Sequence, residues 1–284
     1  MKIIFWSNVH GQSGTSSNML ATAMMNDLLF RNKSILLQTE FDMNELEIPL
    51  LTENRRQQIR NYNVGVDRLI QGIRSGMNAK QLLTSSCITL AKQCIDFLPG
   101  TNAKYRDLYE QEIKTTFREI LSLAEACYEM VFVDVSTGQK DLMDTIWQEA
   151  DVIIVNLCQN KRVIEDFFER FPVDYQKMLF LIGNYDPYSE NNLKNLCNRF
   201  KKLKKDQTFV IPYNTEFRDA ASKAQLTEFF LQNIACEKED DNYAFIQELK
   251  CFTQMLQKRN EECIQRPRFA AQRRTVIGGV TGDY

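Results

Sequence analysis

The chain has 284 residues, of which 44% are hydrophobic and 25% are charged, and its formal net charge is −2. This is enough apolar material for one sizeable core, and α/β chains of this length often form a single domain. The near-neutral charge gives no general indication of nucleic-acid binding. No run approaches the roughly 18 apolar residues of a membrane-spanning helix, and the first residues lack the pattern of a signal peptide, so we expect a cytoplasmic protein.

Short apolar runs alternate with longer amphipathic stretches along the chain. Strands are predicted at 2–7, 34–39, 94–98, 130–135, 152–157, 178–183 and 208–211. Helices are predicted at 16–31, twice or three times within 52–92, and at 104–128, 140–149, 161–170, 189–203 and 242–260. Because continuously apolar strands alternate with helices, we predict an α/β fold with a predominantly parallel central sheet and helices on both faces.

The last residues differ in composition from the rest of the chain. We expect residues 1–262 to form a single domain and residues 263–284, which contain four arginines and three glycines, to form a flexible tail. The alternative is a segment that docks on a partner or a neighbouring subunit, because its apolar side chains, Phe269 and Ile277 among them, are costly to leave in water.

A glycine-containing segment follows the first predicted strand and precedes the first predicted helix. Gly11 and Gly14 allow a turn whose N–H groups point at a phosphate, beside the positive end of the helix. Ser16 or Ser17 offers a hydroxyl for Mg²⁺, but Thr15 stands where such loops normally carry a lysine. The alternatives are a simple tight turn and serines that only cap the helix. The residues predicted to contact a nucleotide here are His10, Gly11, Gln12, Ser13, Gly14, Thr15, Ser16 and Ser17.

Polar residues also follow later strands. Glu40 and Asp42 come after the second strand, on the side of an open α/β sheet where ligands bind. Asp134 ends the fourth strand, where it can hold the water shell of Mg²⁺, and Gly138 lets the backbone approach a γ-phosphate. Asn184 follows a later strand and is suited either to bordering a base or to closing a turn.

These motifs, in this order, resemble those of the MinD/ParA family of deviant Walker-A ATPases. The family's loop reads K-G-G-x-G-K-T-T, and it is followed by a D-x-D, a D-x-x-x-G switch, a strand-ending Asn and an I-P segment. The matching positions are residues 10–17, Glu40 and Asp42, Asp134 to Gly138, Asn184, and Ile211 with Pro212. The resemblance covers about residues 1–235 and looks most like the TadZ/CpaE proteins, which help to position the Tad (Flp) pilus machinery.

The resemblance implies a P-loop NTPase-like fold that binds ATP and Mg²⁺ and forms a homodimer. It implies that Glu40 and Asp42 position the attacking water. It also implies that Ser16, Asp42 and Asp134 hold Mg²⁺, partly through water. Further nucleotide contacts would come from Gly138, Asn184, Pro212 and Tyr213.

Both lysines of the family's loop are replaced in this chain. His10 is shorter than lysine, and histidine as a residue type is only partly charged near neutral pH, while Thr15 carries no charge. Phosphoryl transfer depends on positioning and on neutralising charge, so we expect weak ATP binding with little or no hydrolysis. The expected role is positioning or assembling a Tad/Flp-type pilus or secretion apparatus, whose proteins would be the partners and could recruit the protein to the membrane or cell pole.

Two alternatives remain open at this point. One is a pseudo-ATPase scaffold that never binds nucleotide and acts only through its surfaces. The other is an active DNA-partition ATPase, for which the sequence makes no strong case because both lysines are missing and residues 201–205 form the only strongly basic run.

Overall fold

The computed structural model describes residues 1–41, 46–90, 94–135, 137 and 142–265. Within them, one eight-stranded sheet has the order β3-β4-β2-β5-β1-β6-β7-β8. Neighbouring strands are parallel except β3 and β4, which are antiparallel. The predicted α/β class with a predominantly parallel sheet is therefore confirmed.

Every predicted strand is present, and the short β3 at the edge of the sheet is an addition. The bounds are β1 Lys2–Trp6, β2 Ser34–Gln38, β3 Ile88–Thr89, β4 Ile95–Phe97, β5 Met130–Asp134, β6 Val152–Leu157, β7 Met178–Tyr185 and β8 Thr208–Pro212. The central strands β1, β5 and β6 are buried along their whole length, as expected for a sheet that is covered on both faces.

The helices follow the predicted alternation, and three of them, α2, α10 and α11, lie in stretches for which no element was predicted. The bounds are α1 Thr15–Phe30, α2 Glu47–Leu50, α3 Glu53–Asn61, α4 Val66–Arg74, α5 Ala79–Ser86, α6 Arg106–Cys127, α7 Met143–Glu149, α8 Lys161–Arg170, α9 Leu193–Arg199, α10 Thr215–Ser222, α11 Leu226–Asn233 and α12 Tyr243–Gln265. No helix in the described part of the chain is long and apolar enough to cross a membrane.

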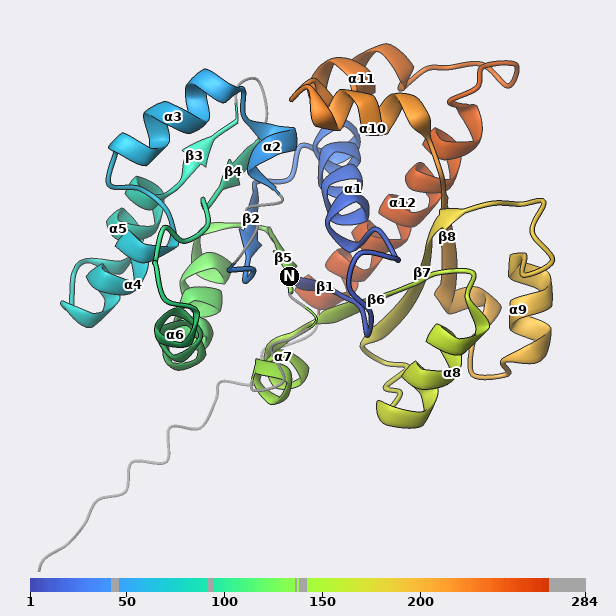
Figure 1. The fold of residues 1–284 in the computed structure, drawn as a ribbon, viewed down its shortest axis with the longest axis horizontal. Coiled ribbons are helices and arrows are strands. Elements are labelled where there is room, and N and C mark those ends of the chain that lie inside the picture. Colours follow the sequence, from blue (N-terminus) through green and yellow to red (C-terminus); the bar gives the residue numbers. More distant parts are fainter. Residues whose placement is uncertain (42–45, 91–93, 136, 138–141, 266–284) are drawn as a thin grey trace, which may run out of the picture.

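The sheet separates two apolar layers, because alternate side chains of each strand point to opposite faces. In β1, Ile3 and Phe5 pack with α1, α10, α11 and α12, whereas Ile4 and Trp6 pack with the helices from α4 to α9. Figure 1 shows α1 and α12 on one side of the sheet and α6 to α8 on the other. Helices therefore cover both faces, as predicted.

The helix α12 reaches beyond the limit predicted for the domain. It continues through Cys263 to Gln265, so the first residues of the predicted tail are helical. Residues 266–284, which hold the rest of that tail, lie outside the described residues.

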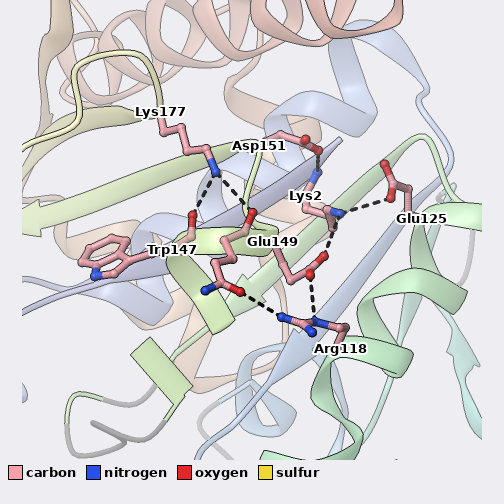
Figure 2. A network of polar contacts seen from close by, with 8 residues as sticks. Lys2, Arg118, Glu125, Trp147, Glu149, Asp151 and Lys177 are labelled. Carbon is pink, nitrogen blue, oxygen red and sulfur yellow. Dashed lines mark hydrogen bonds and ion pairs between the residues drawn. The ribbon is translucent and has the colours of Figure 1, made fainter. Parts of the chain in front are cut away.

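Charged residues tie the helices to the amino ends of the strands (Figure 2). Lys2 Nζ lies 3.2 Å from Glu125 Oε2 of α6 and 3.6 Å from Glu149 Oε2 at the end of α7. The backbone N–H of Lys2 donates to Asp151 Oδ2 at 2.6 Å. Arg118 Nε of α6 adds a 2.9 Å ion pair with Glu149. This network holds α6 and α7 at the amino-terminal ends of the strands, opposite to their carboxyl ends.

Candidate functional site

A pocket of about 250 Å³ lies at the carboxyl ends of the central strands. It combines residues of the loop after β1, the ends of β2, β5 and β7, and the helix α10, which are far apart in the sequence. The lining residues are Val9, His10, Gly11, Gly14, Thr15, Ser16, Ser17, Glu40, Asp134, Val135, Thr137, Asn184 and Arg218. The structure thus brings together most of the described residues that the sequence predicted for the site.

The loop between β1 and α1 has the backbone conformation that its glycines allow. Gly11 and Gly14 have φ values of 73° and 67°, in the left-handed region that glycine adopts without steric cost. Gly14 is the N-cap residue of α1, and no side chain caps the helix there. Ser16 and Ser17 lie inside the first turn, so neither is the N-cap residue that the alternative interpretation required. The first N–H groups of α1 therefore face the pocket without a side-chain cap.

Buried amide side chains hold this loop against the sheet. Asn18 Nδ2 donates to the carbonyl oxygen of Ser13 at 3.2 Å and to Asn156 Oδ1 at 2.9 Å. Ser13 is itself buried, and its hydroxyl shares a 3.1 Å hydrogen bond with that of Thr15. Ser13 and the exposed Gln12 do not line the pocket, so the structure places them behind and beside it.

The loop also lies directly on β7. A methyl group at Gly183 would lie 2.1 Å from the carbonyl oxygen of Ser13, so only glycine leaves room for this contact. The sequence analysis did not single out Asn18, Asn156 or Gly183. Their role depends on the packing of α1, β6 and β7, which no local pattern reveals.

Two carboxylates face the loop across the pocket. Glu40 follows β2 and Asp134 ends β5, and these neighbouring parallel strands bring their carboxyl ends together. Asp134 is buried, and its carbonyl oxygen accepts a 3.0 Å hydrogen bond from the N–H of Thr39. The carboxylate of Asp134 and the hydroxyl of Ser16 are hard oxygen ligands of the kind that Mg²⁺ prefers. The predicted contacts of Asp42 and Gly138 fall outside the described residues.

Asn184 joins the loop to the opposite wall of the pocket. Its backbone is left-handed, with a φ of 50°. Its Nδ2 donates to the carbonyl oxygen of Gln12 at 3.3 Å, and its Oδ1 accepts a 2.9 Å hydrogen bond from Arg218 Nη2. An amide has two N–H donors and two lone pairs, so each end of Asn184 keeps one bonding position for a ligand.

The predicted residues Pro212, which ends β8, and Tyr213, which follows it, contact β7 rather than the pocket. Pro212 pairs with Tyr185 of β7, and the N–H of Tyr213 donates to the carbonyl oxygen of Tyr185 at 3.1 Å. Neither Pro212 nor Tyr213 lines the pocket. Tyr213 reaches it indirectly, because the guanidinium of Arg218 lies 4.8 Å from the centre of its ring.

Arg218 is the functional candidate that the sequence analysis missed. It belongs to α10, in a segment for which no element was predicted, and the sequence analysis gave it no role in the site. Among the described residues that line the pocket, Arg218 and His10 are the basic ones.

Comparison with known proteins identifies the fold. No family model matches the chain, and no sequence among the curated proteins matches it. A ParA family ATPase from Chlorobium tepidum TLS is 10% identical, with a TM-score of 0.68 over 90% of this chain and 98% of that chain. MinD from Pyrococcus horikoshii OT3, solved with Mg-ADP, is 12% identical, with a TM-score of 0.61 over 91% of this chain and 98% of that chain.

A third solved structure has a bound nucleotide analogue. It is a putative plasmid partition protein from Borrelia burgdorferi B31 with AMPPNP, 14% identical, with a TM-score of 0.57 over 90% of this chain and 98% of that chain. At these identities the likeness shows the fold. The chain has the fold of the MinD/ParA ATPases over most of its length.

Proposed function

We propose that the protein is an ATP-binding, dimerising MinD/ParA-like protein with little or no hydrolysis. The observation that carries this proposal is the loop between β1 and α1. There Gly11 and Gly14 turn the chain so that the uncapped start of α1 faces a pocket that also contains Asp134. Backbone N–H groups at the start of a helix bind phosphate through hydrogen bonds and the helix dipole.

The residues present fit Mg²⁺ with a nucleotide. Ser16 and Asp134 would supply oxygen ligands, partly through water, and Asp42 would add a third. Gly11 has open space where a side chain would stand, so a phosphate can approach its backbone. The loop residues that line the pocket, His10, Gly11 and 14–17, would surround the phosphates, and Gly138 would approach the γ-phosphate. Asn184 would border the base, while Pro212 and Tyr213 would only support that wall of the pocket. Two similar folds hold Mg-ADP and AMPPNP, which supports this assignment.

The same pocket is poorly equipped for hydrolysis. Thr15 replaces the lysine that neutralises the β- and γ-phosphates, and its hydroxyl is engaged with Ser13. Glu40 reaches further than the family's aspartate, which disturbs the placement of the attacking water. Stabilising the charge of the transition state is the main contribution to phosphoryl transfer, so turnover should be very slow.

The biological role that we propose is the positioning or assembly of a Tad/Flp-type pilus or secretion apparatus, as in TadZ/CpaE proteins. Proteins of that apparatus would be the partners, and they would recruit a cytoplasmic homodimer to the membrane or cell pole. A MinC:MinD complex of Aquifex aeolicus contains a chain with the same fold, 13% identical and with a TM-score of 0.61. In that complex a protein with this fold is bound to a partner protein, which supports a partner-binding role for this chain.

Titration calorimetry with ATP and Mg²⁺ tests the binding, and a phosphate-release assay tests the turnover. We expect weak, saturable binding that raises the unfolding temperature as nucleotide is added. Turnover should be far below the roughly 1–100 s⁻¹ of kinases. Neither heat nor thermal protection at millimolar nucleotide would refute nucleotide binding and favour the nucleotide-free scaffold. A turnover of about one per second would refute the claim of inactivity.

Two neighbouring serines provide a matched pair of variants for the metal. Ser16→Ala should remove a Mg²⁺ ligand and weaken binding of ATP with Mg²⁺ about 10-fold or more, with little effect on ATP in EDTA. Ser17→Ala removes the same hydroxyl one residue further along α1 and should leave the Mg²⁺ dependence unchanged. Equal effects of the two substitutions would argue against the assigned metal site.

A further inference from the structure

The pocket has lost the lysines of its loop, yet it contains a positively charged side chain from another element. We infer that Arg218 of α10 binds the phosphate groups of the ligand and supplies the positive charge that Thr15 lacks. The inference rests on the proposed nucleotide-binding function and deepens it. In this arrangement, Arg218 is the residue that enables the altered loop to hold a polyanion.

The guanidinium of Arg218 is held in place by two contacts. One Nη2–H donates to Asn184 Oδ1 at 2.9 Å, and the guanidinium carbon lies 4.8 Å from the centre of the Tyr213 ring. A guanidinium has five N–H donors, so the hydrogen bond to Asn184 leaves most of them for a ligand. An arginine that is oriented before binding loses less side-chain entropy when the ligand arrives.

These contacts place Arg218 at the edge of the phosphate-binding loop. Asn184, which accepts the hydrogen bond from Arg218, also donates to the carbonyl oxygen of Gln12. Its side chain lies over Gly14, because a methyl group at Gly14 would be 3.5 Å from Asn184 Nδ2. Arg218 and the start of α1 are therefore joined by a single side chain and border the same pocket.

The charges of the pocket favour an anion at this position. Glu40 and Asp134 line it, and a polyphosphate would be repelled by them unless cations offset their charge. Mg²⁺ beside Ser16 and Asp134 would neutralise one side. On the other side, no carboxylate of the described residues pairs with Arg218, so its charge is not offset within this part of the chain.

The geometry of the side chain also matters. Arginine binds phosphate through two parallel N–H groups, whereas lysine acts as a point charge. A planar guanidinium fixed by Asn184 and by the Tyr213 ring is suited to the first mode. Arg218 follows Gly14 by nearly the whole length of the domain. A search for the loop motif therefore does not find this charge.

The test measures affinity of wild type and Arg218→Ala for two ligands, ATP with Mg²⁺ and inorganic tripolyphosphate with Mg²⁺. A hydrogen bond to a charged group predicts about 10- to 100-fold weaker binding of both ligands by the variant. Arg218→Lys should recover part of the loss, because it restores the charge without the planar donors. Lys223→Ala removes an exposed positive charge from the end of the same helix, outside the pocket lining, and should bind both ligands like wild type.

Each other outcome has a distinct meaning. Unchanged affinity of Arg218→Ala for both ligands overturns the inference and leaves the proposed function standing. A loss for ATP alone assigns the guanidinium to the base or ribose and overturns the phosphate assignment. Wild type that binds tripolyphosphate but not ATP, with a loss in the variant, supports the inference and refutes the nucleotide function. Wild type that binds neither ligand refutes both.

The unfolding temperature of each ligand-free variant shows whether a loss of affinity comes from misfolding. Arg218 is exposed on α10, so the ligand-free variant should unfold at the same temperature as wild type. Arg218→Gln keeps much of the apolar stem and the helix propensity of arginine, and it serves as a second charge-removing variant. The inference requires both variants to lose affinity for both ligands.

Discussion

Gly183 is the residue on which the position of the loop most directly depends. It lies in β7, and the space of its missing side chain is filled by the carbonyl oxygen of Ser13. Both groups belong to the backbone, so neither can move aside as a flexible side chain would. Asn18 then holds the same carbonyl oxygen through its amide. The pocket is thus shaped by a close contact between two backbones as much as by its lining residues.

Gly183→Ala should therefore destabilise the protein and displace the loop. We expect a loss of about 1–3 kcal/mol in the free energy of unfolding, as for overpacked cores, together with loss of ATP binding. Urea unfolding and calorimetry measure the two effects. Gly72→Ala is the matched control, because the nearest atoms to its new methyl group belong to the Leu82 side chain rather than to backbone, far from the loop, and it should keep ATP binding. A Gly183→Ala protein that binds ATP like wild type would contradict this account of the loop.

Individual residues of the site were predictable to different degrees. Gly11 and Gly14 were found because a glycine turn between a strand and a helix is a local pattern. Arg218 and Asn156 were not found, because their roles arise only when β6, β7 and α10 meet the loop. Sequence reasoning thus located the loop, while the residues that hold it and balance its charge required the tertiary structure.

At the scale of elements, α7 is secured by charges at its C-terminal end. Lys177 Nζ donates to the carbonyl oxygen of Trp147 at 2.9 Å, in the last turn of the helix (Figure 2). It also donates to the carbonyl oxygen of Gln148 at 3.3 Å. A positive charge at this end also complements the helix dipole. Lys2 pairs with Glu149 of the same helix and with Glu125 of α6. Both lysines lie at the amino-terminal ends of the strands, away from the pocket, so we assign them a role in the stability of the fold.

Lys2→Met tests this assignment. The side chain of Lys2 is only 11% exposed, and its loss removes one ion pair each from Glu125 and Glu149, although Arg118 still pairs with Glu149. We expect the free energy of unfolding to fall by about 1–2 kcal/mol, with ATP affinity unchanged. Arg199→Met is the control: its pair with Glu165 is about half exposed, so the loss should stay below roughly 0.5 kcal/mol. Equal losses in the two variants would show that burial does not strengthen the Lys2 network.

The elements that were missed share a physical cause. Helix α2 has four residues, which is about one helical turn. Helices α10 and α11 have eight residues each, so the helical period repeats only about twice within each of them. They are held in place by aromatic contacts such as that of Phe217 with Phe245, whose rings are 5.0 Å apart. Strand β3 has two residues and exists only through its pairing with β4. Long, continuously apolar strands carried their own signal, whereas these short elements depend on tertiary packing.

At the scale of the whole molecule, the fold is that of an ATPase family, whereas the residues in the pocket favour binding over hydrolysis in our proposal. The chain has the fold of MinD/ParA ATPases, and its pocket lies at the carboxyl ends of the strands, where open α/β sheets generally bind ligands. In our proposal, Thr15 takes the place of a lysine in the loop, and Arg218 supplies a positive charge from the opposite wall of the pocket. This combination agrees with a protein that uses a nucleotide to hold a conformation or a dimer rather than to drive repeated turnover.

A crystal structure of the protein grown with ATP and Mg²⁺ tests the central claim most directly. We predict a triphosphate on the backbone N–H groups of residues 11–17 and Mg²⁺ beside Ser16. We also predict a phosphate oxygen within about 3 Å of the Arg218 guanidinium, with the γ-phosphate still attached. An empty pocket at millimolar nucleotide, or a nucleotide bound elsewhere on the molecule, would contradict the account.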